Sequence, residues 1–161
     1  MPRAVDRLVA RIKELSNVKS IDSVATNESD AAVRHFQGTT DAGAAIHVLE
    51  ADVLKSLDIA SVDVLYDKDA FGALEPEDRD AYAAQMSRYA RAGSTLLIAG
   101  KHRTHNVDAG PPYNLPQSLI EKTWNAVGFD LVAVHDKLFG GEPSEDRPFS
   151  EITYILKKNR S

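Results

Sequence analysis

The chain of 161 residues contains no cysteine, which excludes disulfide bonds, thiolate metal sites and cysteine nucleophiles. No apolar run approaches the roughly 20 residues that a membrane-spanning helix needs. An excess of positive charge is also lacking, since the formal net charge is −5, and electrostatics gives no reason to expect a nucleic-acid partner. The first residues show no uninterrupted apolar stretch of the kind found in secretory signals. We therefore expect a soluble, cytoplasmic protein that binds neither membranes nor nucleic acids.

Glycine motifs that bind phosphate are missing as well. Neither G-x-x-x-x-G-K-[S/T] nor G-x-G-x-x-G occurs, and no paired glycines precede Gly140, so a plain nucleotide-binding α/β domain is disfavoured. What is present is the composition of a globular protein, 43% apolar and 27% charged, long enough to bury a sizeable core. Because no internal repeat and no domain boundary is visible, we predict a single domain over residues 1–161.

The spacing of apolar residues predicts an order of helices and strands. Helical spacing predicts an amphipathic helix over residues 5–15, and further helices over 76–92, ended by Gly93, and over 115–127. A short helix is predicted over residues 30–36, with a polar loop over 37–43. Short apolar runs predict the strands, at residues 18–26, 44–49, 62–66, 95–99, 129–134 and 152–156.

This alternation of strands and helices favours an open, mostly parallel α/β sheet. The Val-rich strands at residues 44–49 and 62–66 fit a parallel sheet that is covered on both faces. Between residues 129–134 and 152–156 the linker is rich in Gly, Pro and acidic residues. We therefore predict that the last two strands form an antiparallel hairpin at the edge of the sheet.

Two motifs follow predicted strands, at the edge where open α/β sheets place their ligands. Residues 110–113 read Gly-Pro-Pro-Tyr and predict a rigid corner, because proline fixes φ and lacks a backbone donor. Residues 62–79 run from a strand through Asp67 into the pattern Ala-Leu-x-Pro-x-x-Arg at the start of the next helix. A third feature, Gly128 followed by Phe129, precedes the penultimate strand.

These three features, in this order and spacing, resemble the thiopurine S-methyltransferase family and the related halide/thiol methyltransferases over residues 20–157. The resemblance implies a Rossmann-like fold that binds S-adenosylmethionine, and methyl transfer to a small soft nucleophile such as a thiol, thiopurine, hydrosulfide or halide. Positioning and desolvation can supply most of the catalysis of such an in-line displacement. A dedicated general base is optional for an acidic thiol, so no catalytic residue is assigned.

The resemblance also suggests residues that bind the cofactor. Asn27 falls at the acidic position that contacts the ribose hydroxyls, although Glu28 could take that place and both could instead form a helix-capping turn. Asp52 matches an aspartate that contacts the adenine amino group, and Val53 the residue packed on the ring; Asp52 could also be an exposed cap. Lys68 matches an arginine that reaches the methionine carboxylate, with the charge kept and the bidentate fork lost.

For the methyl acceptor, Tyr113 is the candidate aromatic contact, with packing under the proline corner as the alternative. Trp124 is expected in the core. His102, His105 and Asp108 have a spacing that could suggest a metal, but a solvated loop that touches substrate is the preferred interpretation, and no metal is expected.

The first strand and the G-x-G-x-G turn of such folds do not occur before the first predicted helix. Three interpretations remain open. The chain is a fragment of an active enzyme, or a shortened relative with weak or lost cofactor binding that serves as a binding or regulatory module. Alternatively, it completes its sheet with another chain, as a homodimer or with a full-length homologue. We expect a methyltransferase with a small-molecule acceptor, and turnover by this chain alone is left open.

Overall fold

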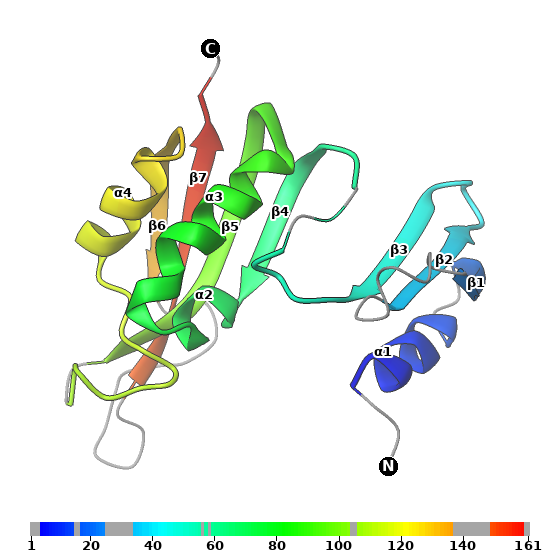
Figure 1. The fold of residues 1–161 in the computed structure, drawn as a ribbon, viewed down its shortest axis with the longest axis horizontal. Coiled ribbons are helices and arrows are strands. Elements are labelled where there is room, and N and C mark those ends of the chain that lie inside the picture. Colours follow the sequence, from blue (N-terminus) through cyan, green and yellow to red (C-terminus); the bar gives the residue numbers. More distant parts are fainter. Residues whose placement is uncertain are drawn as a thin grey trace. The chain divides into compact units, whose positions relative to one another are not determined.

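The structure is a computed structural model that describes residues 4–14, 17–24, 34–55, 57, 59–103, 106–136 and 149–159. The chain divides into two compact units, Met1–Lys55 and Ser56–Ser161, and each is described by itself (Figure 1). Within the described ranges, no helix is long and apolar enough to cross a membrane. The single domain over residues 1–161 stays a prediction.

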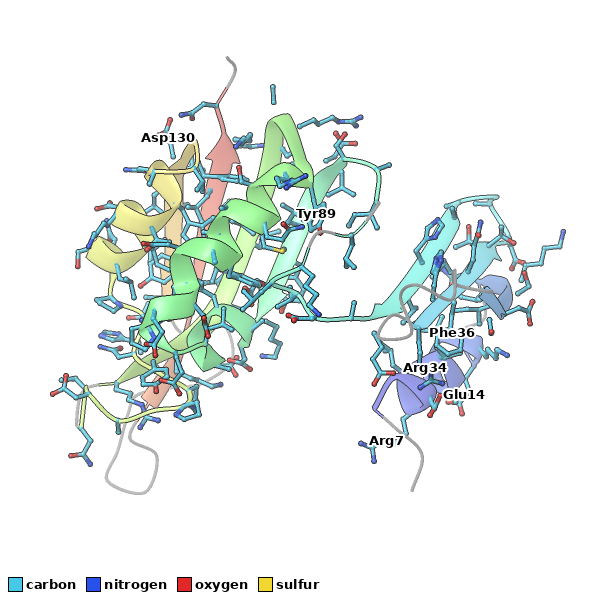
Figure 2. The ribbon with its side chains drawn as sticks, viewed as in Figure 1. Arg7, Glu14, Arg34, Phe36, Tyr89 and Asp130 are labelled. Carbon is cyan, nitrogen blue, oxygen red and sulfur yellow. The ribbon has the colours of Figure 1, made fainter. Side chains whose placement is uncertain are left out.

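In its described residues, the first unit is a three-stranded antiparallel sheet with one helix. Its elements are α1 (Ala4–Lys13), β1 (Val18–Val24), β2 (Arg34–Thr40) and β3 (Ala45–Glu50), and the strand order is β1-β2-β3. Val9 of α1 packs with Ile21 and Val48 of the sheet, which confirms the amphipathic helix. Arg34 of β2, labelled in Figure 2, links the elements of the unit, because its guanidinium lies 2.6 Å from Asp6 of α1 and 3.0 Å from Glu50 of β3.

The sequence predictions for this unit fail between residues 34 and 50. Residues 34–36 belong to β2 and not to a helix, and residues 37–40 continue this strand where a loop was predicted. β3 is present as predicted but pairs antiparallel with β2 and not in a parallel sheet. The reason is local: Thr40 accepts a backbone hydrogen bond at 2.9 Å from Gly43, whose φ is 82°, and this tight turn folds β3 directly back onto β2.

The second unit is a four-stranded sheet with the strand order β4-β5-β7-β6. β4 and β5 are parallel, and β7 is antiparallel to both β5 and β6, so the predicted antiparallel hairpin is confirmed. The elements in chain order are β4 (Val62–Lys68), α2 (Ala70–Ala73), η2 (Pro76–Asp78), α3 (Arg79–Arg88), β5 (Ala90–Arg103), α4 (Gln117–Asn125), β6 (Phe129–Asp136) and β7 (Phe149–Lys158).

The core of this unit lies between the sheet and the helices α2, α3 and α4 (Figure 1). Trp124 of α4 is fully buried, with its ring 5.5 Å from Phe71, 5.8 Å from Phe129 and 6.4 Å from Tyr82, which confirms its core position. On β4 the side chains alternate, and Val64 and Tyr66 point away from this core with exposed fractions of 58% and 62%. Within the second unit the described residues leave this face of β4 uncovered, and whether both faces of the strand are covered in the chain stays a prediction.

The helix predicted over residues 76–92 ends earlier, at Arg88. β5 begins at Ala90, and Gly93 lies inside it with a φ of 83° instead of ending the helix. The cause is pairing between strands: the backbone N–H of Val62 donates to the carbonyl of Tyr89 at 2.7 Å. The chain therefore begins to pair with β4 directly after the helix ends. β5 consequently extends well beyond the predicted strand at residues 95–99.

Candidate functional site

The candidate site lies at the carboxyl ends of the parallel strands β4 and β5, the edge where α/β sheets bind ligands. β4 ends in Asp67 and Lys68, and Asp69 follows with a left-handed φ of 64°. The backbone N–H of Asp69 donates to the carbonyl of Ala99 on β5 at 2.8 Å. This bond fixes the turn from β4 into α2 against the neighbouring strand.

Asp67 organises this turn from inside the core. Its side chain, in a residue only 3% exposed, accepts hydrogen bonds from the hydroxyl of Tyr82 at 2.7 Å and from the backbone N–H groups of Ala70 at 2.9 Å and Phe71 at 3.1 Å. Burial raises the pKa of Asp67, and the hydrogen bond from Tyr82 acts against that rise. The aspartate that ends the strand therefore caps α2 and holds α3 to β4.

Four charged side chains meet where β4, β5 and β7 come together. The ammonium of Lys101 lies 2.8 Å from Glu151 and 3.9 Å from Asp69, and that of Lys68 lies 3.5 Å from Glu151 and 3.9 Å from Asp69. The hydrogen bond from Lys101 is the main reason that the pKa of Glu151 lies below its ordinary value. Lys68, half exposed, is thus a surface cation shared between two carboxylates.

The proline corner is fastened to the same edge of the sheet. The Gly110–Pro111 and Pro111–Pro112 peptide bonds are both cis. After the corner, the backbone N–H of Tyr113 donates to the carbonyl of Gly72 in α2 at 2.7 Å, and that of Leu115 donates to the carbonyl of Lys101 in β5 at 3.2 Å. The corner therefore bridges the segment after β4 and the end of β5, as its place after a strand predicted.

An open pocket of about 430 Å³ lies between the corner and the start of α3, and Arg79, Asp108, Tyr113 and Asn114 are among its lining residues. Arg79 is only 7% exposed, and its guanidinium lies 5.0 Å from the ring centre of Tyr113 and 5.7 Å from that of Phe71. Its Nε and Nη2 atoms are buried and have no hydrogen-bond partner among the described residues.

The unpaired donors of Arg79 point to a ligand. Nε and Nη2 lie on one edge of the guanidinium and present two parallel N–H groups, the geometry that binds a planar anion through two oxygens. Burial lowers the pKa of Arg79, while Tyr113 and Glu75 act to raise it. A buried cation with unsatisfied donors is costly unless an anion completes it. Sequence reasoning did not select Arg79, although it is the last residue of the Ala-Leu-x-Pro-x-x-Arg pattern.

The predicted site residues are distributed over both units. Asn27 lies outside the described residues. Asp52 belongs to the first unit, where its Oδ1 accepts a hydrogen bond from the backbone N–H of Leu54 at 3.0 Å, and the adjacent Val53 is 38% exposed. Lys68 and Tyr113 belong to the second unit. Whether these residues act together stays a prediction.

Of the three residues with metal-like spacing, His102 lies on β5 and Asp108 lines the pocket beside Arg79. His105 lies outside the described residues.

Comparison with solved structures shows the fold. The N-methyltransferase NodS from Bradyrhizobium japonicum in complex with S-adenosylhomocysteine matches with a TM-score of 0.54 and 12% identity, over 69% of this chain and 53% of that protein. The 1,6-didemethyltoxoflavin-N1-methyltransferase of Burkholderia thailandensis, with bound S-adenosylhomocysteine, has a TM-score of 0.52 and 13% identity, over 69% of this chain and 50% of that protein. The predicted Rossmann-like methyltransferase fold with its antiparallel hairpin is confirmed.

Comparison of sequences shows the family. The thiopurine S-methyltransferase of Vibrio campbellii is 24% identical over 104 residues, 62% of this chain and 47% of that protein. The enzyme of the same name from Lycaon pictus is 31% identical over 74 residues, 46% of this chain and 30% of that protein. The chain thus spans half or less of the length of these curated relatives. The family model for thiopurine S-methyltransferase matches residues 11–150, and the chain therefore belongs to this family.

Proposed function

We propose that the protein transfers a methyl group from S-adenosylmethionine to a small, thiol-like or related soft nucleophile by in-line displacement. The observation that carries the proposal is the buried guanidinium of Arg79, which lines a pocket beside the Gly-Pro-Pro-Tyr corner and whose Nε and Nη2 donors are unpaired among the described residues. Family membership supports the reaction class, and two proteins of similar fold were solved with S-adenosylhomocysteine.

The acceptor side of the proposal rests on Arg79 and Tyr113. A cation next to the sulfur of a bound thiol favours the thiolate, which is the nucleophilic form. The pocket walls include the ring of Tyr113 and the side chains of Val107 and Leu119, and such apolar groups strip water from a bound anion. Arg79 would thereby hold an ionised acceptor without a general base, and Tyr113 would orient it.

The cofactor side rests on Asn27, Asp52, Val53 and Lys68, which we propose as its binding residues. When bound, S-adenosylmethionine supplies an electrophilic methyl group on a sulfonium sulfur. Lys68 fits the cofactor's carboxylate in charge and position, at the end of β4. Its ammonium, however, already lies next to Asp69 and Glu151. These two carboxylates compete with the carboxylate of the cofactor for the ammonium of Lys68. We therefore expect a weaker hold on the cofactor than an arginine fork would give.

Binding and turnover test the proposal separately. Calorimetric titration of the purified chain with S-adenosylmethionine should show saturable binding, and the absence of binding at millimolar concentration would rule out cofactor use by this chain. In a methyl-transfer assay with a small aromatic thiol, Arg79→Gln should raise KM for the thiolate. Arg91→Gln is the matched control, because Arg91 is an exposed arginine of β5 that pairs with Asp63. Equal effects of the two substitutions would contradict the role of Arg79.

A second candidate function is a weak or inactive methyltransferase-like module that pairs with a second copy or with a full-length homologue. It is favoured by β4, which lies at the edge of the four-stranded sheet in the described part of the chain and exposes Val64 and Tyr66. Sedimentation equilibrium of the chain alone and mixed with a full-length homologue distinguishes the two. A folded monomer that binds neither cofactor nor partner would count against this candidate.

A further inference from the structure

Tyr113 is held at both ends against the pocket that contains Arg79. Its backbone N–H donates to the carbonyl of Gly72 at 2.7 Å, and its hydroxyl donates to the Oε2 atom of Glu75. Glu75 itself is exposed and immediately precedes Pro76 at the start of η2. The ring between these two attachments lies over the guanidinium of Arg79, so Glu75 fixes the wall of the pocket from its rim.

The hydrogen bond to Glu75 also determines which group of Tyr113 is available to contact a ligand. Because that carboxylate accepts the phenolic proton, the pKa of Tyr113 is raised and the hydroxyl stays neutral. Its proton is engaged at the rim, so Tyr113 presents a ring to the pocket. Arg79 lines the pocket, and its Nε and Nη2 donors have no partner among the described residues, so its guanidinium is the group that we expect to bind an anion.

The charges around the pocket limit the number of negative charges that a bound anion can carry. The carboxylate of Glu75 acts electrostatically on both Arg79 and Tyr113, and Asp108 lines the pocket. A ligand with one negative charge can place it on the guanidinium of Arg79. A second negative charge would lie among these carboxylates, and repulsion of this kind is how a binding site rejects a competitor.

We propose that Glu75, held at the rim by Tyr113, is a specificity-determining residue that restricts this pocket to ligands with a single negative charge. The inference deepens the proposed function and rests on it only in taking this pocket as the acceptor site. It predicts an acceptor that is a monoanion when bound, such as a thiolate without a further acidic group. Binding of a simple anion tests it without cofactor or turnover.

The experiment compares benzoate with isophthalate, which carries a second carboxylate on the same ring, by NMR titration of the purified chain without cofactor. The wild-type chain should bind benzoate more tightly than isophthalate, with shifts at residues of the pocket. Glu75→Gln removes the charge but keeps an oxygen that accepts the Tyr113 hydroxyl. The ratio of the two dissociation constants should shift toward isophthalate by about two- to fivefold, the range for an exposed charge pair.

Glu77→Gln is the matched control, since it removes one exposed carboxylate two residues away, and it should change the ratio much less. An unchanged ratio in Glu75→Gln, or an equal change in Glu77→Gln, would overturn the inference. If Arg79→Gln abolishes benzoate binding while Glu75→Gln leaves the ratio unchanged, only the role of Glu75 is refuted and the proposed function stands. If neither anion binds the wild-type chain, both this inference and the acceptor pocket are refuted.

Discussion

The hydrogen bond between Tyr82 and Asp67 should be a main support of the turn that carries Lys68 and Asp69. Tyr82 of α3 is 2% exposed and donates its hydroxyl to Asp67 at 2.7 Å. The substitution Tyr82→Phe removes this donor and keeps the ring that packs with Phe71 and Trp124. It leaves the carboxylate of Asp67 in the core with only its backbone donors.

The size of the effect follows from burial and charge. A hydrogen bond to a charged group contributes about 1.5–3 kcal/mol to stability. Because the N–H groups of Ala70 and Phe71 still bind the carboxylate of Asp67, we expect Tyr82→Phe to lower the free energy of unfolding by about 2 kcal/mol. Urea denaturation followed by tryptophan fluorescence measures this loss, because the only tryptophan, Trp124, lies in the same core.

The stability loss caused by Tyr82→Phe should depend on pH, and the pKa of Asp67 determines the direction of that dependence. Burial raises the pKa of Asp67, so the charged form costs stability above that pKa and the cost disappears as the pH falls through it. The hydrogen bond from Tyr82 stabilises the charged form, and Tyr82→Phe should therefore raise the pKa of Asp67 further. The stability difference between wild type and variant should be largest at neutral pH and shrink in acid, where Asp67 is protonated in both.

The control is Tyr66→Phe, which removes a hydroxyl from a tyrosine that is 62% exposed and precedes Asp67 on the same strand, β4. Such a surface change should stay within about 0.5 kcal/mol. Three results would refute the reasoning: a loss for Tyr82→Phe of less than about 0.5 kcal/mol, a loss that does not depend on pH, or an equal loss in the control.

Three further substitutions test other parts of the structure. Gly38→Ala should unfold or severely destabilise the first unit, seen as lost amide-exchange protection in β1 to β3, because its Cβ would overlap backbone atoms of β1. Gly100→Ala should lower the urea midpoint of the second unit by an amount equivalent to about 1–3 kcal/mol, because the added methyl group would overlap the buried Leu115. Glu151→Gln should destabilise the chain at neutral pH and lose this effect in acid. The lowered pKa of Glu151 stabilises the fold above the ordinary value of 4.5, and that contribution is lost as the pH falls below 4.5 and through the lowered pKa of the folded chain.

Much of the second unit could be predicted from sequence because its signals are local. β4, α4 and the β6–β7 hairpin lie close to the predicted ranges, since short apolar runs and the linker between the last strands determine them. The predictions failed where pairing with a distant strand decides the structure. β5 starts at Ala90 because Tyr89 is already paired with Val62. The helical pattern of residues 79–88 contains no information about this pairing. In the first unit, the turn that closes at Gly43 pairs β2 with β3, and residues 34–36 of the predicted helix belong to β2.

The candidate site shows the same division between local and long-range information. The proline corner and the Ala-Leu-x-Pro-x-x-Arg pattern were each visible in the sequence, because proline and glycine restrict the backbone locally. Their connection was not visible: it requires the backbone bond from Tyr113 to Gly72 and the ring of Tyr113 over Arg79, which lies 34 residues earlier in the chain. The sequence identified Asp67 as the end of a strand. Its structural role in the core depends on the hydrogen bond from Tyr82, 15 residues later. Motifs that bend the chain can therefore be found from sequence alone, whereas the buried cation they surround becomes a candidate binding group only once the fold shows that its donors have no partner.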